Sequence, residues 1–138
     1  MEVKFIKRNI FQRLLGLPTT RPPSDEKCWT YRNGTVTIDL ARAPELSKIG
    51  GAIRLEKKNL PERILVIRTD DGRFHAFLNK CKHMGRRLDP VPDTETIQCC
   101  SVNKTTYDFK GEVLFGPAKK SVQPYPVTVT DKTLEIKL

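Results

Sequence analysis

Residues 81–104 read CKHMGRRLDPVPDTETIQCCSVNK and carry the pattern on which the fold prediction depends. They open with Cys81 and His83 in a Cys-x-His arrangement and close with the adjacent Cys99 and Cys100. Sixteen residues separate His83 from Cys100, which is enough for a loop and one returning strand, so we expect the two ends to meet. Two thiolates and an imidazole from two loops suit either a zinc ion or an iron–sulfur cluster. The stretch therefore predicts a metal site.

The chain has 138 residues, which is enough for one domain with a buried core. Its 38% apolar and 30% charged residues are typical of a water-soluble globular protein. The apolar runs are far shorter than the roughly 20 residues that cross a bilayer, and no secretory signal pattern is visible. We therefore expect a cytoplasmic, reducing compartment, where clustered cysteines are metal ligands or catalytic groups rather than a disulfide framework. Cys28, remote in sequence, is expected to be a small buried side chain.

The formal net charge of +9 favours an acidic protein partner or an anionic membrane surface over nucleic acid. Lysines and arginines are spread along the chain without a long basic tract. Because only 7% of residues are aromatic, few side chains are available to stack on bases. Nucleic acid is therefore not an expected partner.

Residues 3–17, VKFIKRNIFQRLLGL, predict an amphipathic helix that Gly16 and Pro18 end. Its apolar residues recur at three- and four-residue steps. We favour a terminal helix packed on the domain, and the alternative is peripheral membrane contact through residues 3–17. A mitochondrial presequence is a third interpretation, because acidic residues are nearly absent before Asp25. The proline-rich residues 18–27 predict an extended connector, so helix and connector together occupy residues 1–34.

From residue 35 to residue 138 the pattern is that of short strands separated by Gly and Pro. Residues 70–72, Asp-Asp-Gly, predict a hairpin turn between two of them. Strands at this regular spacing indicate an all-β antiparallel sandwich or barrel. The expected strands are 35–40, 52–55, 64–68, 74–78, 95–98, 106–109, 113–115, 125–129 and 134–137.

The segments around the two cysteine groups resemble the Rieske family. NKCKHMGRRLD, residues 79–89, is similar to the family's first cluster loop, and CSVN, residues 100–103, stands where the family has Cys-x-x-His. YDFKG, residues 107–111, with the later Gly-Pro-Ala and Tyr-Pro-Val, is similar to the segments that follow. The resemblance covers roughly residues 35–138 and implies a Rieske-like fold with two metal-binding loops.

Such a resemblance implies a [2Fe–2S] cluster, with one iron held by two cysteines and the other by two histidines. Carried over, Cys81 and Cys100 bind one iron, and His83 is one ligand of the other. The second histidine is replaced by Asn103, whose amide oxygen is a weak ligand for iron compared with imidazole. The other histidine, His75, lies inside a predicted strand and is expected to be an ordinary strand side chain.

Three answers to the fourth ligand remain open. Asn103 or a water completes the coordination, Cys99 supplies a third thiolate, or the cluster is absent. Cys99 suits iron chemically, but neighbours in an extended segment point to opposite faces, so Cys99 and Cys100 share one cluster only across a sharp bend. Cys28 is a more remote candidate.

In the family's higher-potential members, a serine and a tyrosine two and four places after the second histidine form hydrogen bonds with cluster sulfurs. Thr105 and Tyr107 stand at these positions, and both have hydroxyl groups. Such bonds stabilise the reduced cluster and raise its potential. The cysteine that forms a loop-linking disulfide in respiratory members is replaced by Arg86, so that disulfide is not expected.

The leading hypothesis is an electron carrier, a small Rieske-type ferredoxin with atypical ligation, and not an independent enzyme. Two histidines, one of them in the metal loop, do not supply a catalytic triad, and a separate oxygenase domain has no room in 138 residues. Basic residues beside the loops predict a redox partner with an acidic docking surface. The alternatives are a clusterless Rieske-like domain acting as an enzyme subunit or interaction module, and a structural zinc site.

Overall fold

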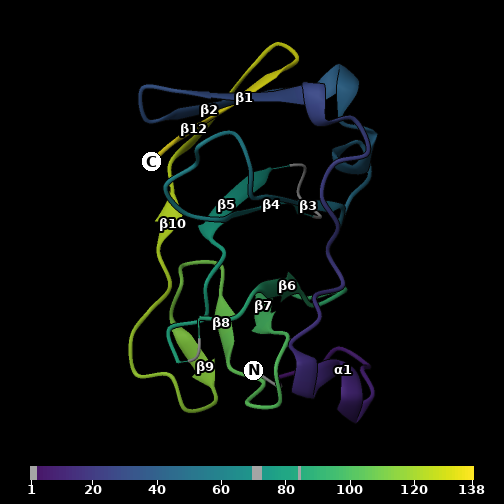
Figure 1. Cartoon of the computed structure of the whole chain (residues 1–138), viewed down its shortest axis with the longest axis vertical. Coiled ribbons are helices and arrows are strands. Elements are labelled where there is room, and N and C mark those ends of the chain that lie inside the picture. Colours follow the sequence, from purple (N-terminus) through teal and green to yellow (C-terminus); the bar gives the residue numbers. More distant parts are fainter. Residues whose placement is uncertain (1–2, 70–72, 84) are drawn as a thin grey trace.

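The computed structural model describes residues 3–69, 73–83 and 85–138, and consists mainly of three four-stranded antiparallel sheets arranged along its longest axis (Figure 1). The outer sheet has the order β1-β2-β12-β11, with β1 (Trp29–Arg32), β2 (Thr35–Asp39), β11 (Val127–Thr130) and β12 (Thr133–Lys137). The middle sheet has the order β10-β5-β4-β3, with β3 (Ala52–Leu55), β4 (Ile64–Arg68), β5 (Phe74–Leu78) and β10 (Pro124–Tyr125). The loop sheet has the order β6-β7-β8-β9, with β6 (Leu88–Pro90), β7 (Thr96–Cys99), β8 (Thr106–Asp108) and β9 (Val113–Phe115). This all-β architecture confirms the predicted fold class.

Strand β4 is buried on both of its faces, which explains why its sequence is an unbroken apolar run instead of an alternating one. Ile64 and Val66 pack in the core shared with the outer sheet. Leu65 and Ile67 pack in the core shared with the loop sheet. The middle sheet is therefore the wall between two hydrophobic cores.

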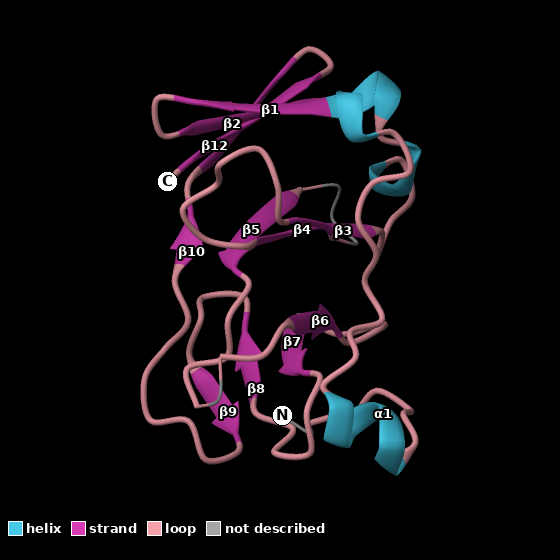
Figure 2. Ribbon diagram, in the orientation of Figure 1, coloured by secondary structure: helices cyan, strands magenta, loops and turns pink. Residues whose placement is uncertain are grey.

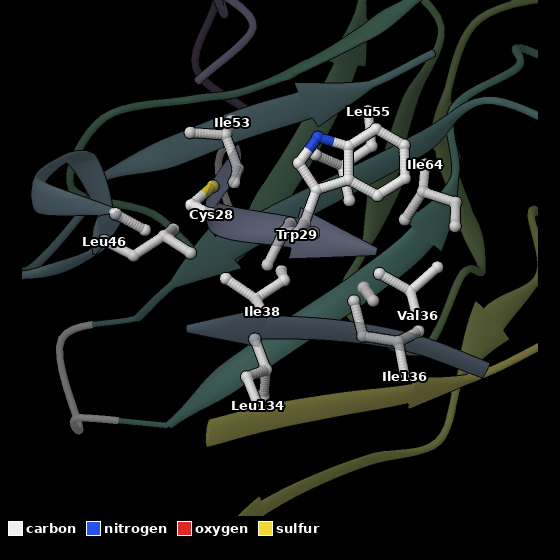
Figure 3. Close-up of a cluster of buried hydrophobic side chains, with 13 residues drawn as sticks. Cys28, Trp29, Val36, Ile38, Leu46, Ile53, Leu55, Ile64, Leu134 and Ile136 are labelled. Atoms are coloured by element: carbon white, nitrogen blue, oxygen red, sulfur yellow. The ribbon is translucent and has the colours of Figure 1, made fainter. Parts of the chain in front are cut away.

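The core between the outer and middle sheets is built around Trp29, which is 1% exposed (Figure 3). Its ring packs with alternating residues of both sheets, and its Nε1 donates to Glu26 Oε2 at 3.2 Å. Cys28 belongs to this core too, in the short 3₁₀ helix η1 (Glu26–Cys28) that leads into β1. Two further 3₁₀ helices, η2 (Leu40–Arg42) and η3 (Pro44–Leu46), close the side of this core.

The second core lies between the middle and loop sheets and extends to the predicted metal loops. Phe77 from β5 and Ile97 from β7 pack there with Tyr107 from β8. Cys81 and Cys99 are members of the same buried cluster. Residues of the middle and loop sheets therefore bury these two cysteines together.

Helix α1 (Ile10–Leu15) is much shorter than the predicted helix over residues 3–17 (Figure 2). Asn9 begins it through a capping box, in which Asn9 Oδ1 accepts from Gln12 N–H and Gln12 Oε1 accepts from Asn9 N–H. Gly16 ends it in the left-handed conformation, with φ of 64°. Residues 4–6 instead pair with a side chain of the loop sheet, Gln98. In the described part of the chain, no helix is long and apolar enough to span a membrane.

Other strands differ from the prediction in their bounds. The predicted strand at 125–129 is two strands, because Pro126 has no N–H for a ladder and the chain passes there from the middle sheet to the outer sheet. The predicted connector ends early, because residues 29–32 form β1, and the prediction also missed β6. The hairpin pairing of β4 with β5 is confirmed, whereas its predicted turn at 70–72 lies outside the described residues.

Candidate metal centre

The first predicted metal loop connects β5 to β6 and is held closed by its own backbone. Cys81 N–H donates to Arg86 O at 2.7 Å, and Gly85 N–H donates to Cys81 O at 2.7 Å. Buried Asn79 closes the base of the loop, since its Oδ1 accepts from Leu88 N–H at 2.7 Å. Asn79, two residues before Cys81, therefore stabilises the loop from within the core.

The second predicted loop connects β7 to β8 and meets the first. Cys99 N–H donates to Thr105 O at 2.7 Å, which closes the second loop at its base. Cys100 N–H donates to Arg87 O at 3.1 Å, which joins the two loops directly. The expectation that the two cysteine groups close on each other is therefore confirmed.

The three thiols of the loops are all buried, but they face two different ways. A hydrogen bond with Cys81 and burial raise the pKa of the Cys99 thiol, and Ser101 Oγ lies 3.2 Å from Cys99 Sγ. Cys100 points away from this pair, and its Sγ donates to Gly16 O at 3.0 Å. Burial raises the pKa of the Cys100 thiol as well. Cys99 and Cys100 thus have the opposite orientations that an extended chain predicts.

His83 and Asn103 lie together on the rim of the two loops. Asn103 Nδ2 donates to His83 Nδ1 at 3.1 Å, and Asn103 Oδ1 accepts from Thr105 N–H at 2.9 Å. The second bond fixes the amide orientation, because only the oxygen accepts a proton from a backbone N–H. Position 103 therefore faces His83, and its assignment as a ligand position stays a prediction.

The two predicted hydroxyl residues, Thr105 and Tyr107, are both buried. Tyr107 accepts from Lys82 N–H at 3.0 Å, and its oxygen lies 3.6 Å from Cys81 Sγ. Burial raises the pKa of Tyr107. Thr105 Oγ1 is buried and has no hydrogen-bond partner among the residues that the structure describes. Gly116 packs against this threonine so closely that a Cβ at Gly116 would lie 2.6 Å from Thr105 Cα.

A contact that the sequence did not predict joins α1 to the second loop. Arg13 is buried, and its Nη1 donates to Ser101 O at 3.2 Å. Its Nη2 donates to Ile6 O at 2.6 Å, which turns residues 3–8 back toward the loop sheet. Burial, followed by the charge of Arg8, lowers the pKa of Arg13. Apolar periodicity could not reveal this contact, because it counts arginine as a solvent-facing residue.

Two residues considered at the sequence level lie elsewhere. Cys28 is in the core with the outer sheet, where burial raises the pKa of its thiol to about 11, so it is not a partner of the loop cysteines. His75 packs in β5 against the Phe109 ring, with centroids 4.8 Å apart. Across the described residues, no three His, Cys, Asp or Glu side chains converge closely enough to hold one metal ion. In the structure, the Cys99 thiol is hydrogen-bonded with Cys81, and Asn103 is hydrogen-bonded to His83. The Cys100 thiol is instead hydrogen-bonded to the Gly16 carbonyl.

The basic residues beside the loops differ in the contacts that their side chains make. Arg87 is paired with Glu56, a residue of the segment after β3. Arg86 packs against Gly16. Lys82 is exposed, and the Lys104 ammonium lies 5.6 Å from the centre of the Phe5 ring. The rim of the two loops is therefore basic, although Arg87 already forms an ion pair with the Glu56 carboxylate.

The family model for the Rieske [2Fe-2S] domain matches residues 38–126. The chain belongs to the Rieske family. This match spans the middle sheet and both metal loops, and ends at the proline between β10 and β11.

Individual relatives share short or distant similarity. The glycine betaine monooxygenase oxygenase subunit of Chromohalobacter salexigens is 38% identical over 53 residues, which are 38% of this chain and 12% of that protein. The chain thus spans only a small part of that relative. Among solved structures, the ferredoxin of carbazole 1,9a-dioxygenase from Nocardioides aromaticivorans IC177 has a TM-score of 0.59 at 19% identity, covering 73% of this chain and 96% of that one.

A second solved structure is the plasma membrane Rieske protein PetC3 from Synechocystis PCC 6803. It has a TM-score of 0.52 at 20% identity, covering 62% of this chain and 86% of that one. At such identities, these two structures show the shared fold.

A Rieske domain implies a [2Fe–2S] cluster, and the chain has thiol and imidazole groups of the kind that would hold it, although Cys100 Sγ is turned to Gly16 O. Buried thiols come from both loops, and His83 lies on their common rim. The unpartnered Thr105 Oγ1 is a donor that a sulfur-rich group would satisfy. The departure is Asn103, whose amide oxygen is already occupied by Thr105 N–H.

Proposed function

We propose that this chain is an electron-transfer protein with a Rieske-type [2Fe–2S] cluster of atypical ligation. Cys81 and Cys100 would hold one iron and His83 the other, with the fourth position facing Asn103. The contact of 3.1 Å between Asn103 Nδ2 and His83 Nδ1 carries the proposal, because it brings position 103 to the neighbouring ligand. The cluster supplies reversible one-electron chemistry when bound.

The roles of the chain's own residues follow from their places. Tyr107 presents its hydroxyl to Cys81 Sγ, and Thr105 presents an unused hydroxyl beside the second loop. Hydrogen bonds to the ligand sulfurs stabilise the more negative, reduced state, so both hydroxyls raise the potential. The surrounding core keeps water from the thiolate side.

The fourth ligand has two candidates with different support. Asn103 lies beside His83, but its oxygen must leave Thr105 N–H before it can bind iron. Cys99 has the chemically better donor atom and already contacts Cys81. Cys100 would have to release the Gly16 carbonyl in order to turn toward Cys81.

The proposed partner is a redox protein with an acidic docking surface. Lys82 is exposed beside His83, and Lys104 follows Asn103, so the rim carries positive charge where electrons would leave. Solved structures similar in fold include complexes of oxygenase with ferredoxin in carbazole 1,9a-dioxygenase, for example one covering 81% of this chain at 22% identity with a TM-score of 0.59. This likeness supports a role in electron transfer to or from an oxygenase or reductase.

A reducing, cytoplasmic location is part of the proposal, since the four cysteines are free thiols.

A second candidate is a clusterless domain that supports an enzyme as a subunit. The observation that favours it is that two of the proposed ligands already have partners, since His83 is bonded to Asn103 and Cys100 Sγ donates to the Gly16 carbonyl. Retention of two buried cysteines and a rim histidine speaks for the cluster. A structural zinc site uses the same residues and is the third outcome of the test.

The test is a metal count. The protein is purified without oxygen; iron, acid-labile sulfide and zinc are measured per chain, and an electron paramagnetic resonance spectrum is recorded after reduction. Two irons and two sulfides with a signal on reduction support the electron carrier. Stoichiometric zinc in a colourless protein indicates the structural site, and no metal after reconstitution indicates the clusterless subunit.

A further inference from the structure

Helix α1 buries its arginine and exposes its large apolar side chains. Ile10 and Phe11 are 59% and 73% exposed, and Leu14 and Leu15 are 56% and 66% exposed. Leu17, just after the helix, is 45% exposed. These five residues are called the apolar face of α1 below.

This arrangement is the reverse of a helix packed on a domain, in which the apolar stripe faces the core. The inward position is taken by Arg13, which is 5% exposed and bonds to Ser101 O and Ile6 O. The apolar residues are consequently turned away from the loop sheet. A contiguous exposed apolar patch on a folded protein marks an interaction surface.

Further exposed apolar side chains lie at this end of the molecule. Phe5 stacks edge-on against Phe115 of β9, with ring centroids 5.1 Å apart, and both rings are more than two-fifths exposed. Val102, at the tip of the second loop, is 44% exposed. In Figure 1, α1 lies at the end of the long axis that also contains β8 and β9.

The segments that build this end of the molecule contain many cations and no acidic residue. Residues 3–24 contain five Lys or Arg and no Asp or Glu. Residues 80–88 and 100–107 contain five more Lys or Arg, of which Arg87 is paired with Glu56, and again no Asp or Glu. Contacts place two of these cations beside the N-terminal segment, since Arg86 packs on Gly16 and Lys104 lies over Phe5.

We propose that the apolar face of α1 inserts into the surface of an anionic lipid bilayer. Apolar side chains on a helix flanked by cations match such a surface, because the acyl region takes the apolar groups and the headgroups neutralise the cations. A bilayer also needs no matching shape, which suits a short helix at one end of the molecule (Figure 2). The inference goes beyond electron transfer and requires no bound cluster.

The contacts of α1 also fix the side on which the bilayer lies. Gly16 accepts from Cys100 Sγ, and Arg13 donates to Ser101 O, so α1 is attached to the second metal loop. A bilayer bound to the apolar face of α1 therefore lies at the loop end of the protein and away from the outer sheet.

The test is co-sedimentation of the full chain with vesicles. One set is phosphatidylcholine, and the other is phosphatidylcholine mixed with phosphatidylglycerol. We expect binding to the mixed vesicles only, and loss of that binding at high salt. Phe11→Ser removes the most exposed apolar side chain and should weaken partitioning about tenfold. Lys7→Glu reverses one charge and should also weaken it about tenfold.

Matched controls lie outside the loop end. Ile49→Ser removes a 60% exposed apolar side chain after η3, and Lys132→Glu reverses an exposed charge between β11 and β12. Both control variants should bind like the wild type. Equal losses in the controls, equal binding to both kinds of vesicle, or retained binding by Phe11→Ser would overturn the proposal.

Absence of vesicle binding overturns it as well. If light scattering then shows a dimer that Phe11→Ser dissociates, the face belongs to a second copy, and if an acidic protein competes for it, the face belongs to that partner. The assay is run on both iron-free and iron-loaded protein. If the metal count shows that no cluster is bound, the vesicle-binding result still stands.

Discussion

Arg13 Nη1 donates a hydrogen bond to the carbonyl oxygen of Ser101, a residue 88 positions further along the chain. The bond fastens a segment outside the matched Rieske domain to the loop that contains Cys100. Three donations by one buried guanidinium, to Ser101 O, Ile6 O and Gln98 Oε1, connect α1, the residues before it and strand β7. The second metal loop therefore depends on residues that precede the domain.

Removal of this connection should destabilise the protein. In Arg13→Ala, the carbonyls of Ser101 and Ile6 lose a charged donor, and bonds of this kind contribute about 2 kcal/mol each at most. We expect the free energy of unfolding, measured by urea titration, to fall by about 2–4 kcal/mol. Lys7→Ala, on an exposed neighbour, is the control and should change it by less than about 0.5 kcal/mol. An equal effect of both changes would show that Arg13 is not the connecting residue.

The fourth ligand can be identified by substitution. Asn103→His places an imidazole beside His83 and should shift the visible and electron paramagnetic resonance spectra toward those of a two-histidine centre. Cys99→Ser should leave the iron content unchanged if Asn103 faces the iron. An unchanged Asn103→His spectrum together with iron loss in Cys99→Ser would instead establish a three-cysteine site.

The hydroxyl of Tyr107 should tune the reduction potential. Tyr107→Phe removes the oxygen that lies 3.6 Å from Cys81 Sγ, and Thr105→Ala removes the unpartnered hydroxyl. Loss of a hydrogen bond of about 1 kcal/mol lowers a one-electron potential by roughly 40 mV, so each variant should show a fall of that order in a redox titration. Tyr125→Phe, in β10, is the matched control. A potential that falls equally in the control would refute a specific role for Tyr107.

Cys28 should make stability depend on alkaline pH. Burial raises the pKa of its thiol from 9.0 to about 11, so the folded state keeps a proton that the unfolded state loses. The stabilisation is complete below pH 9.0 and is lost as pH rises through about 11, by up to about 2–3 kcal/mol. Comparison of Cys28→Ala with the wild type by urea titration at several pH values isolates this contribution. Parallel curves for the two proteins would show that Cys28 does not titrate in this way.

Much of the fold could be predicted, because strand spacing and turn residues are local properties. Strands β3, β4 and β5 have the predicted bounds, and the two loops meet as the Cys-x-His and Cys-Cys spacing indicates. The opposite orientations of Cys99 and Cys100 followed from the geometry of an extended chain.

The parts that could not be predicted depend on distant contacts. The periodicity of residues 3–17 predicts which residues share a face, but the burial of Arg13 depends on carbonyls of Ile6 and Ser101. Likewise, nothing local reveals that the chain changes sheets at Pro126 or that Cys100 meets Gly16. The family resemblance assigned position 103 to the ligand next to His83, and Asn103 does lie beside His83, but the resemblance did not reveal that Thr105 N–H occupies the Asn103 oxygen.

Strand β4 is the partition shared by both cores, since Ile64 packs on one side and the adjacent Leu65 on the other. A change in packing around Trp29 is therefore separated from the metal loops by the thickness of one sheet. Because close-packed interiors transmit strain, we expect a disturbance of the core around Trp29 to reach the two loops through β4. On that argument, residues on the far side of that partition contribute to the rigidity of the two loops.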